Sequence, residues 1–130
     1  MKQPFIISAL VILFTNISCA QEVPTISPKE VKARIDQGTN AVLLDVRRQE
    51  EIDRGVIDKD IIAYDFYHSA FKDNLVKLDK DKTYYVYCHA GGRSGKTVKM
   101  MQELGFKNVF NVEGGITQWK AEGMELVEKD

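Results

Sequence analysis

A chain of 130 residues is long enough for one domain with one hydrophobic core, and it shows no internal repeat or low-complexity segment. Its 18 Lys and Arg residues nearly balance its 19 Asp and Glu residues, which leaves a formal net charge of −1. Without a basic excess, we expect neither nucleic acid nor an anionic membrane surface as a partner.

The first twenty residues have the composition of an export signal. Lys2 precedes an apolar run over residues 5–14, and the small side chains of Ser18 and Ala20 suit signal peptidase. We expect residues 1–20 to be removed after Ala20, which places the mature chain in the periplasm or another extracytoplasmic space. A membrane span needs ~20 apolar residues and this run is shorter, so we expect no stable membrane association.

Lipidation at Cys19 is the alternative fate of this leader. Against it, Asn16 stands three residues before Cys19, where a lipoprotein signal normally has an aliphatic side chain. Cleavage after Ala20 removes one cation and no anion, so 17 basic groups remain against 19 acidic groups, and Cys88 becomes the single cysteine. An exported chain with one cysteine has no internal disulfide, and its unpaired thiol is a liability unless the protein uses it. Chance retention of the thiol is the alternative.

Residues 21–26 are predicted to form a short arm that leads into one domain over residues 27–130. Ser27 occupies the position of a helix N-cap, Pro28 is suited to the first helical position, and Gly38 ends this helix. Strands are then expected near residues 41–46, 61–66, 83–87 and 106–112, and helices near residues 50–54, 69–78, 94–104 and 116–121.

Strands that alternate with helices favour an α/β fold with a parallel sheet, right-handed crossovers and helices on both faces. Ligands of such sheets bind beyond the carboxyl ends of the strands. Cys88 directly follows the strand expected at residues 83–87, so its thiol is expected at such an end.

We call residues 88–94, which follow this strand, the thiol loop. Gly91 and Gly92 allow a tight turn, and a helical pattern begins near Ser94. The loop amides and the positive end of that helix would then converge on the sulfur of Cys88 and stabilise its thiolate. The alternative is a small buried cysteine that only packs at the end of a core strand.

The spacing within the thiol loop distinguishes between two chemistries. Arg93 follows Cys88 with four residues between them, whereas a cysteine phosphatase needs five to wrap a tetrahedral phosphate. The shorter loop suits a compact group bonded to the cysteine sulfur, such as a second sulfur atom. It disfavours a phosphatase or an arsenate reductase that would use the same cysteine.

Three motifs resemble those of single-domain rhodanese-like sulfurtransferases. Residues 88–93, Cys-His-Ala-Gly-Gly-Arg, are similar to the C-x-x-G-x-R loop of that family. Residues 45–52, which contain Asp-Val-Arg and Glu-Glu, resemble its D-V-R and E-E-aromatic signature. Residues 113–119 resemble its closing E-G-G-I-x-x-W element, and together the motifs place residues 27–127 in the family's order.

The resemblance implies one rhodanese-like domain with a central, mainly parallel, five-stranded sheet, and it implies a sulfurtransferase reaction. Cys88 would attack the outer sulfur of thiosulfate or a similar donor, carry that sulfur as a persulfide and pass it to a thiophilic acceptor. No metal and no organic cofactor is implied. We expect a monomer whose partners are a small sulfur donor and a low-molecular-weight or protein thiol. The implied substrate-binding residues are His89, Ala90, Gly91, Gly92, Arg93 and Ser94, supported by Asp45, Arg47 and Glu51.

The chain departs from the family after Gly55. The family usually carries a histidine, a glycine-alanine pair and an asparagine there, whereas this chain has Val56, Lys59, Asp60 and Ile62. The departures affect local backbone geometry and partner binding more than the chemistry, because the thiol loop is intact. They keep open a second class of function, a non-catalytic rhodanese-homology binding module or a sulfur-relay module that acts with a partner protein.

Two thiol-loop residues have alternative roles. His89 could ligate a metal, but the other histidine is His68 and no second thiol remains, so we interpret His89 as lining the pocket mouth. Arg93 either holds the sulfonate of the donor or braces the loop by pairing with Glu51 or Asp45. We favour bracing, because the loop amides already supply anion contacts.

The remaining motif residues are interpreted as structural. Gly114 and Gly115 are expected to form a turn with positive φ, and Trp119 to pack in the core. Asp45 and Arg47, at the end of an expected strand, are interpreted chiefly as scaffold.

Overall fold

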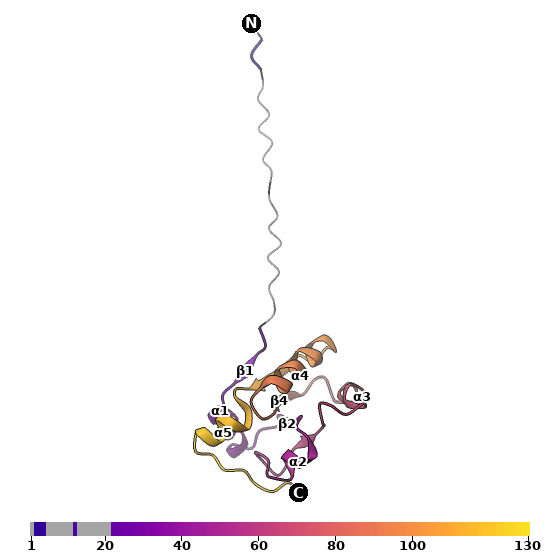
Figure 1. The fold of residues 1–130 in the computed structure, drawn as a ribbon. Coiled ribbons are helices and arrows are strands. Elements are labelled where there is room, and N and C mark those ends of the chain that lie inside the picture. The colour runs from indigo at the N-terminus through magenta and orange to yellow at the C-terminus, as the bar shows by residue number, and fades with distance from the viewer. Residues whose placement is uncertain (1, 5–11, 13–21) are drawn as a thin grey trace.

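A computed structural model describes residues 2–4, 12 and 22–130 of the chain (Figure 1). The predicted cleavage after Ala20 and the alternative lipidation of Cys19 fall outside the described residues. Within the described part of the chain, no helix is both long enough and apolar enough to cross a membrane.

A five-stranded sheet forms the centre of the fold. Its strands lie in the order β1-β5-β4-β2-β3, and every neighbouring pair is parallel. This confirms the predicted α/β fold with a mainly parallel, five-stranded sheet. The strands are β1 (Thr25–Ile26), β2 (Val42–Asp45), β3 (Ile62–Ala63), β4 (Thr83–Tyr87) and β5 (Asn108–Val112).

Helices cover both faces of this sheet, as expected (Figure 1). Side chains on β4 alternate between the faces: Val86 packs with buried residues of α3 and α4, and Tyr85 packs with buried residues of α1 and α5. The sheet therefore separates two apolar clusters, which explains why its central strands are continuous apolar runs in the sequence. The helices are α1 (Pro28–Asp36), α2 (Gln49–Ile52), α3 (Phe71–Val76), α4 (Gly92–Glu103) and α5 (Gly115–Ala121).

The segment predicted as an arm contributes the edge strand β1 to the sheet. In β1, Thr25 pairs with Asn111 and Ile26 pairs with Val112, and the Ile26 side chain is buried. The segment expected as an arm therefore contributes a strand to the sheet before Ser27. Two residues are too few to show an alternating pattern, and they become a strand because β5 supplies the hydrogen-bond partners.

The segment that departs from the family is held by the C-terminal tail. Val56 is fully buried, and its amide and carbonyl both bond with Val127 at 2.8 Å in an antiparallel bridge. Trp119 is also buried, as predicted, and its indole N–H donates to the carbonyl of Glu125 at 3.0 Å. The tail thus packs beside the family-divergent segment.

Candidate active site

The thiol loop lies at the carboxyl end of β4, as predicted for a site on a parallel sheet. Gly91 has φ of 105°, in the left-handed region that favours glycine, and α4 begins immediately after it at Gly92. The helix starts two residues earlier than the sequence pattern indicated. Arg93 and Ser94 therefore belong to the first turn of α4 and not to an irregular loop, because the turn at Gly91 is completed within one residue.

The sulfur of Cys88 is buried and faces hydrogen-bond donors. Only 1% of the residue is exposed, the Gly91 amide donates to Sγ at 3.1 Å, and the Ser94 hydroxyl lies 3.3 Å from Sγ. Burial raises the pKa of this thiol, but hydrogen bonds from the Ser94 side chain and from backbone amides of the loop outweigh burial and lower the pKa. The arrangement favours a thiolate nucleophile over an inert packed cysteine.

A polar chain connects Ser94 to the turn of the loop through Asn111 on β5. The Ser94 hydroxyl donates to Asn111 Oδ1 at 2.6 Å, and Asn111 Nδ2 donates to the carbonyl of Gly91 at 3.2 Å. Asn111 was not among the residues expected at the site. Asparagine occurs twice in β5, at Asn108 and Asn111, and nothing in the sequence singles out Asn111 as a neighbour of the thiol loop.

Arg93 pairs with Glu51, one of the two partners considered for it. Its Nη1 and Nη2 donate to the two carboxylate oxygens of Glu51, each at 2.8 Å, and the two side chains are 17% and 26% exposed. Hydrogen bonding from Arg93 lowers the pKa of Glu51 to about 2, and Glu51 in turn raises the pKa of Arg93. The geometry is that of a brace between α2 and the first turn of α4.

A second, fully buried ion pair positions α2. Asp45 accepts from the Arg47 guanidinium at 2.8–3.0 Å, and Arg47 also donates to the carbonyls of Gly55 at 2.8 Å and Glu51 at 3.3 Å. Of the two predicted scaffold residues, Arg47 contacts the backbone of Glu51, and Asp45 holds Arg47. Within the described part of the chain, neither of them has a hydrogen bond to the sulfur of Cys88.

The start of α5 holds the backbone of the thiol loop. The amides of Ile116 and Thr117 donate to the carbonyls of Cys88 and His89 at 3.0 and 2.9 Å. Gly115 has φ of 55°, and a Cβ on it would overlap the Cys88 carbonyl oxygen and lie 2.8 Å from that of His89. The positive φ expected for Gly114 and Gly115 is confirmed. The close approach of Gly115 to the loop could not be read from the sequence.

His89 lies at the mouth of the site. It is exposed, and it lines a hollow of about 240 Å³ together with two exposed cations, Arg54 and Lys120. Ala90 and Gly92 are exposed as well. Among the described residues, no group of three or more His, Cys, Asp or Glu side chains is arranged to hold a metal ion.

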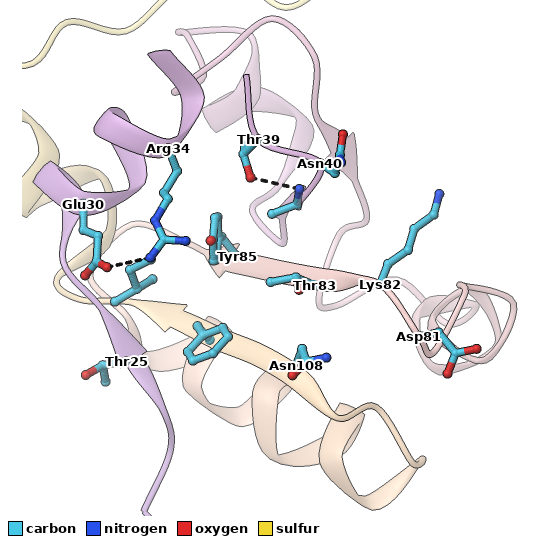
Figure 2. A pocket seen from close by; sticks show the side chains of 13 residues that line it. Thr25, Glu30, Arg34, Thr39, Asn40, Asp81, Lys82, Thr83, Tyr85 and Asn108 are labelled. Carbon is cyan, nitrogen blue, oxygen red and sulfur yellow. Dashed lines mark hydrogen bonds and ion pairs between the residues drawn. The ribbon is translucent and has the colours of Figure 1, made fainter. Parts of the chain in front are cut away.

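Among the described residues, a hollow of about 650 Å³ lies at the opposite edge of the sheet. Ala41, just before β2, and Thr83 and Asn108, at the amino ends of β4 and β5, line it. Glu30 and Arg34, which pair one turn apart on α1, line it as well (Figure 2). Its lining residues include no thiol and no cluster of groups suited to catalysis. We therefore assign the candidate active site to the thiol loop, with the smaller hollow lined by His89 as its mouth.

Replacing Gly115 by alanine should destabilise the protein by about 3 kcal/mol or more, because the new Cβ adds a clash with the loop backbone to the strain of a positive φ. Gly38 is a matched control, since it has φ of 78° and no atom lies within 4 Å of the place that a Cβ would take. Gly38→Ala should cost about 1–2 kcal/mol. Urea unfolding of both variants measures this, and equal costs would contradict the importance of the close approach.

The Glu51–Arg93 pair should stabilise the fold in a pH-dependent way. The pKa of Glu51 is lowered from 4.5 to about 2, so its contribution is fully present above about pH 4.5 and is lost as the pH falls toward 2. Glu51→Gln should therefore cost about 1–3 kcal/mol near pH 7 and progressively less in acid.

Urea unfolding of wild type and Glu51→Gln, from about pH 7 to about pH 3, measures this difference. Glu50→Gln is the control on an exposed position of the same helix, expected to change stability by less than about 0.5 kcal/mol. A wild-type advantage that stays constant or grows in acid would show that the pair does not stabilise the fold in this way.

Comparisons with known proteins agree with this geometry. The family model described as "Rhodanese-like domain" matches residues 27–122. "Putative sulfurtransferase YtwF" of Bacillus subtilis is 37% identical over 101 residues, which cover 78% of this chain and 94% of that protein. "Putative sulfur carrier protein YrkF" of the same organism is 30% identical over 100 residues, and the match covers 77% of this chain and 52% of that protein.

Solved structures resemble the fold as well. The rhodanese-related protein from Thermoplasma volcanium superimposes with a TM-score of 0.70 at 31% identity, covering 80% of this chain and 97% of that one. A family model that covers most of the domain, and a relative matched over nearly its whole length, agree with the thiol at the end of β4. The chain therefore belongs to the rhodanese-like domain family.

Proposed function

We propose that the protein is an exported sulfurtransferase that carries sulfane sulfur on Cys88. The observation that supports this most directly is a buried thiol with a lowered pKa, whose sulfur accepts the Gly91 amide at 3.1 Å beside the start of α4. Relatives named as sulfurtransferases share the domain.

The proposed first half-reaction begins with the Cys88 thiolate. It attacks the outer sulfur of thiosulfate, a new S–S bond forms, and the S–S bond of the donor breaks so that sulfite leaves with the bonding electron pair. The terminal sulfur of the persulfide then carries the negative charge. Amides between His89 and Ser94 are placed to solvate it, because they surround the start of α4.

In the second half-reaction an acceptor removes the outer sulfur. A thiolate, or cyanide in an assay, attacks the terminal sulfur, and Cys88 leaves as a thiolate that the same donors stabilise. The cationic mouth formed by Arg54 and Lys120 favours the approach of an anionic donor. Arg93 is assigned a bracing role, because both of its terminal nitrogens are engaged by Glu51.

A sulfur-relay module is the second candidate. It is favoured by the similarity to a protein named as a sulfur carrier, and by the segment after Gly55, whose departures from the family lie beside the C-terminal tail. In that case the persulfide would form in the same way, but a protein thiol would be the acceptor and small acceptors would react slowly.

Incubation of the full chain with thiosulfate should add the mass of one sulfur atom, because the Cys88 thiolate retains the outer sulfur of the donor. Cys88→Ser should abolish both the added mass and sulfur transfer to cyanide, whereas the control Cys19→Ser should keep both. Intact mass spectrometry beside a thiocyanate assay measures these outcomes. An unchanged wild-type mass, or sulfur transfer by Cys88→Ser, would exclude the proposed chemistry. Persulfide formation without transfer to small acceptors would favour the relay module.

The protein recovered from its native host should begin at Gln21, because Ser18 and Ala20 provide the small side chains that signal peptidase requires. N-terminal sequencing and intact mass check this. A lipid-modified Cys19 or an uncut chain would contradict export as a cleaved protein, and neither result would bear on the chemistry at Cys88.

A further inference from the structure

Ser94 has one hydroxyl proton and two neighbours that can receive it. Asn111 Oδ1 lies 2.6 Å from Ser94 Oγ, and the sulfur of Cys88 lies 3.3 Å from the same oxygen. A serine hydroxyl donates a single hydrogen bond and accepts through its lone pairs. The two neighbours therefore compete for that proton whenever the sulfur carries negative charge.

The orientation of the Asn111 side chain is set by the turn of the thiol loop. Its Nδ2 faces the carbonyl of Gly91 at 3.2 Å, and a carbonyl oxygen can only accept. Asn111 Oδ1 must then face Ser94, and it can only accept the Ser94 proton. With the proton held there, the Ser94 lone pairs face Cys88, which matches a neutral thiol that donates to Ser94 Oγ.

We infer that Asn111 is a positioning residue. Its Oδ1 accepts the hydrogen bond of the Ser94 hydroxyl while the Cys88 sulfur is neutral, and the hydroxyl donates to that sulfur instead when the thiolate forms. Rotation of one O–H bond accomplishes the change, and no heavy atom needs to move. Asn111 thus opposes ionisation of the thiol, since forming the thiolate withdraws the donor from Asn111 Oδ1.

This inference rests on the proposed function for its place in the reaction. The charge lies on Cys88 Sγ in the free thiolate and moves to the outer sulfur in the persulfide, so the Ser94 proton returns to Asn111 once the persulfide has formed. When an acceptor removes the outer sulfur, Sγ becomes the leaving thiolate and the Ser94 proton turns back to it. The switch follows the charge through both half-reactions without a gain or loss of protons.

Other charged groups near the thiol are not altered by changes at these two positions. Arg93 on α4 is held by Glu51 of α2 through two hydrogen bonds, and His89, the next residue in the chain, is exposed with its ring near Thr117. The Gly91 carbonyl also keeps a second donor, the Gly95 amide at 3.0 Å, when the Asn111 side chain is removed.

The test is a double-mutant cycle on the full chain, with the rate of alkylation of the Cys88 peptide by iodoacetamide measured against pH by mass spectrometry. Asn111→Ala should lower the pKa of Cys88 by about half a unit to one unit, because Ser94 is then free to donate to the thiolate. Ser94→Ala should raise the pKa by a similar amount. In the Ser94→Ala background, Asn111→Ala should change it no further.

Asn108→Ala, at an exposed position of the same strand, is the matched control and should leave the pKa of Cys88 unchanged. Asn111→Leu replaces Asn111→Ala if thermal melting shows that the alanine variant is unfolded. A raised or unchanged pKa in the Asn111 variant overturns the inference, and so does an equal shift in the Ser94→Ala background. Alkylation requires no sulfur transfer, so a failure of the proposed persulfide chemistry would leave this readout intact and distinguishable.

Discussion

The backbone of the thiol loop is clamped between the starts of two helices, and the site depends on that clamp. The amides of Ile116 and Thr117 donate to the carbonyls of Cys88 and His89, while the Gly91 amide donates to the sulfur of Cys88. The carbonyls of the loop thus accept hydrogen bonds from α5, whereas an amide of the same loop donates to the sulfur. The amides of the loop are therefore available to stabilise negative charge on Cys88.

Burial and hydrogen bonding have opposite effects on the pKa of the Cys88 thiol. Removing Cys88 from water opposes the thiolate, and the donors around Sγ reverse the sign of that effect on the pKa. Each donor therefore matters more than it would at the surface, because few other groups offset desolvation. The competition between Cys88 and Asn111 for the Ser94 proton is significant for the same reason.

Two ion pairs connect the buried core to Arg93 in the first turn of α4. Asp45 and Arg47 form the buried pair, and Arg47 donates to the backbone of Glu51, whose carboxylate then receives Arg93. Breaking the Asp45–Arg47 pair would leave one buried charge without its partner, so this pair resists disruption. Because Arg47 also bonds to the Glu51 backbone, the buried pair fixes the position of the Glu51–Arg93 pair. The arginine that follows the candidate nucleophile thereby gains a fixed position without touching the sulfur.

The sequence by itself determined the features that depend on neighbouring residues. These are the alternation of strands and helices, the thiol at a strand end and the four-residue spacing to Arg93. Tertiary structure decided the rest. Thr25 became part of a strand only beside β5, Arg93 selected Glu51 at a separation of 42 residues, and Ser94 met Asn111 at a separation of 17. Such partners are set by the order of strands in the sheet, which no local pattern records.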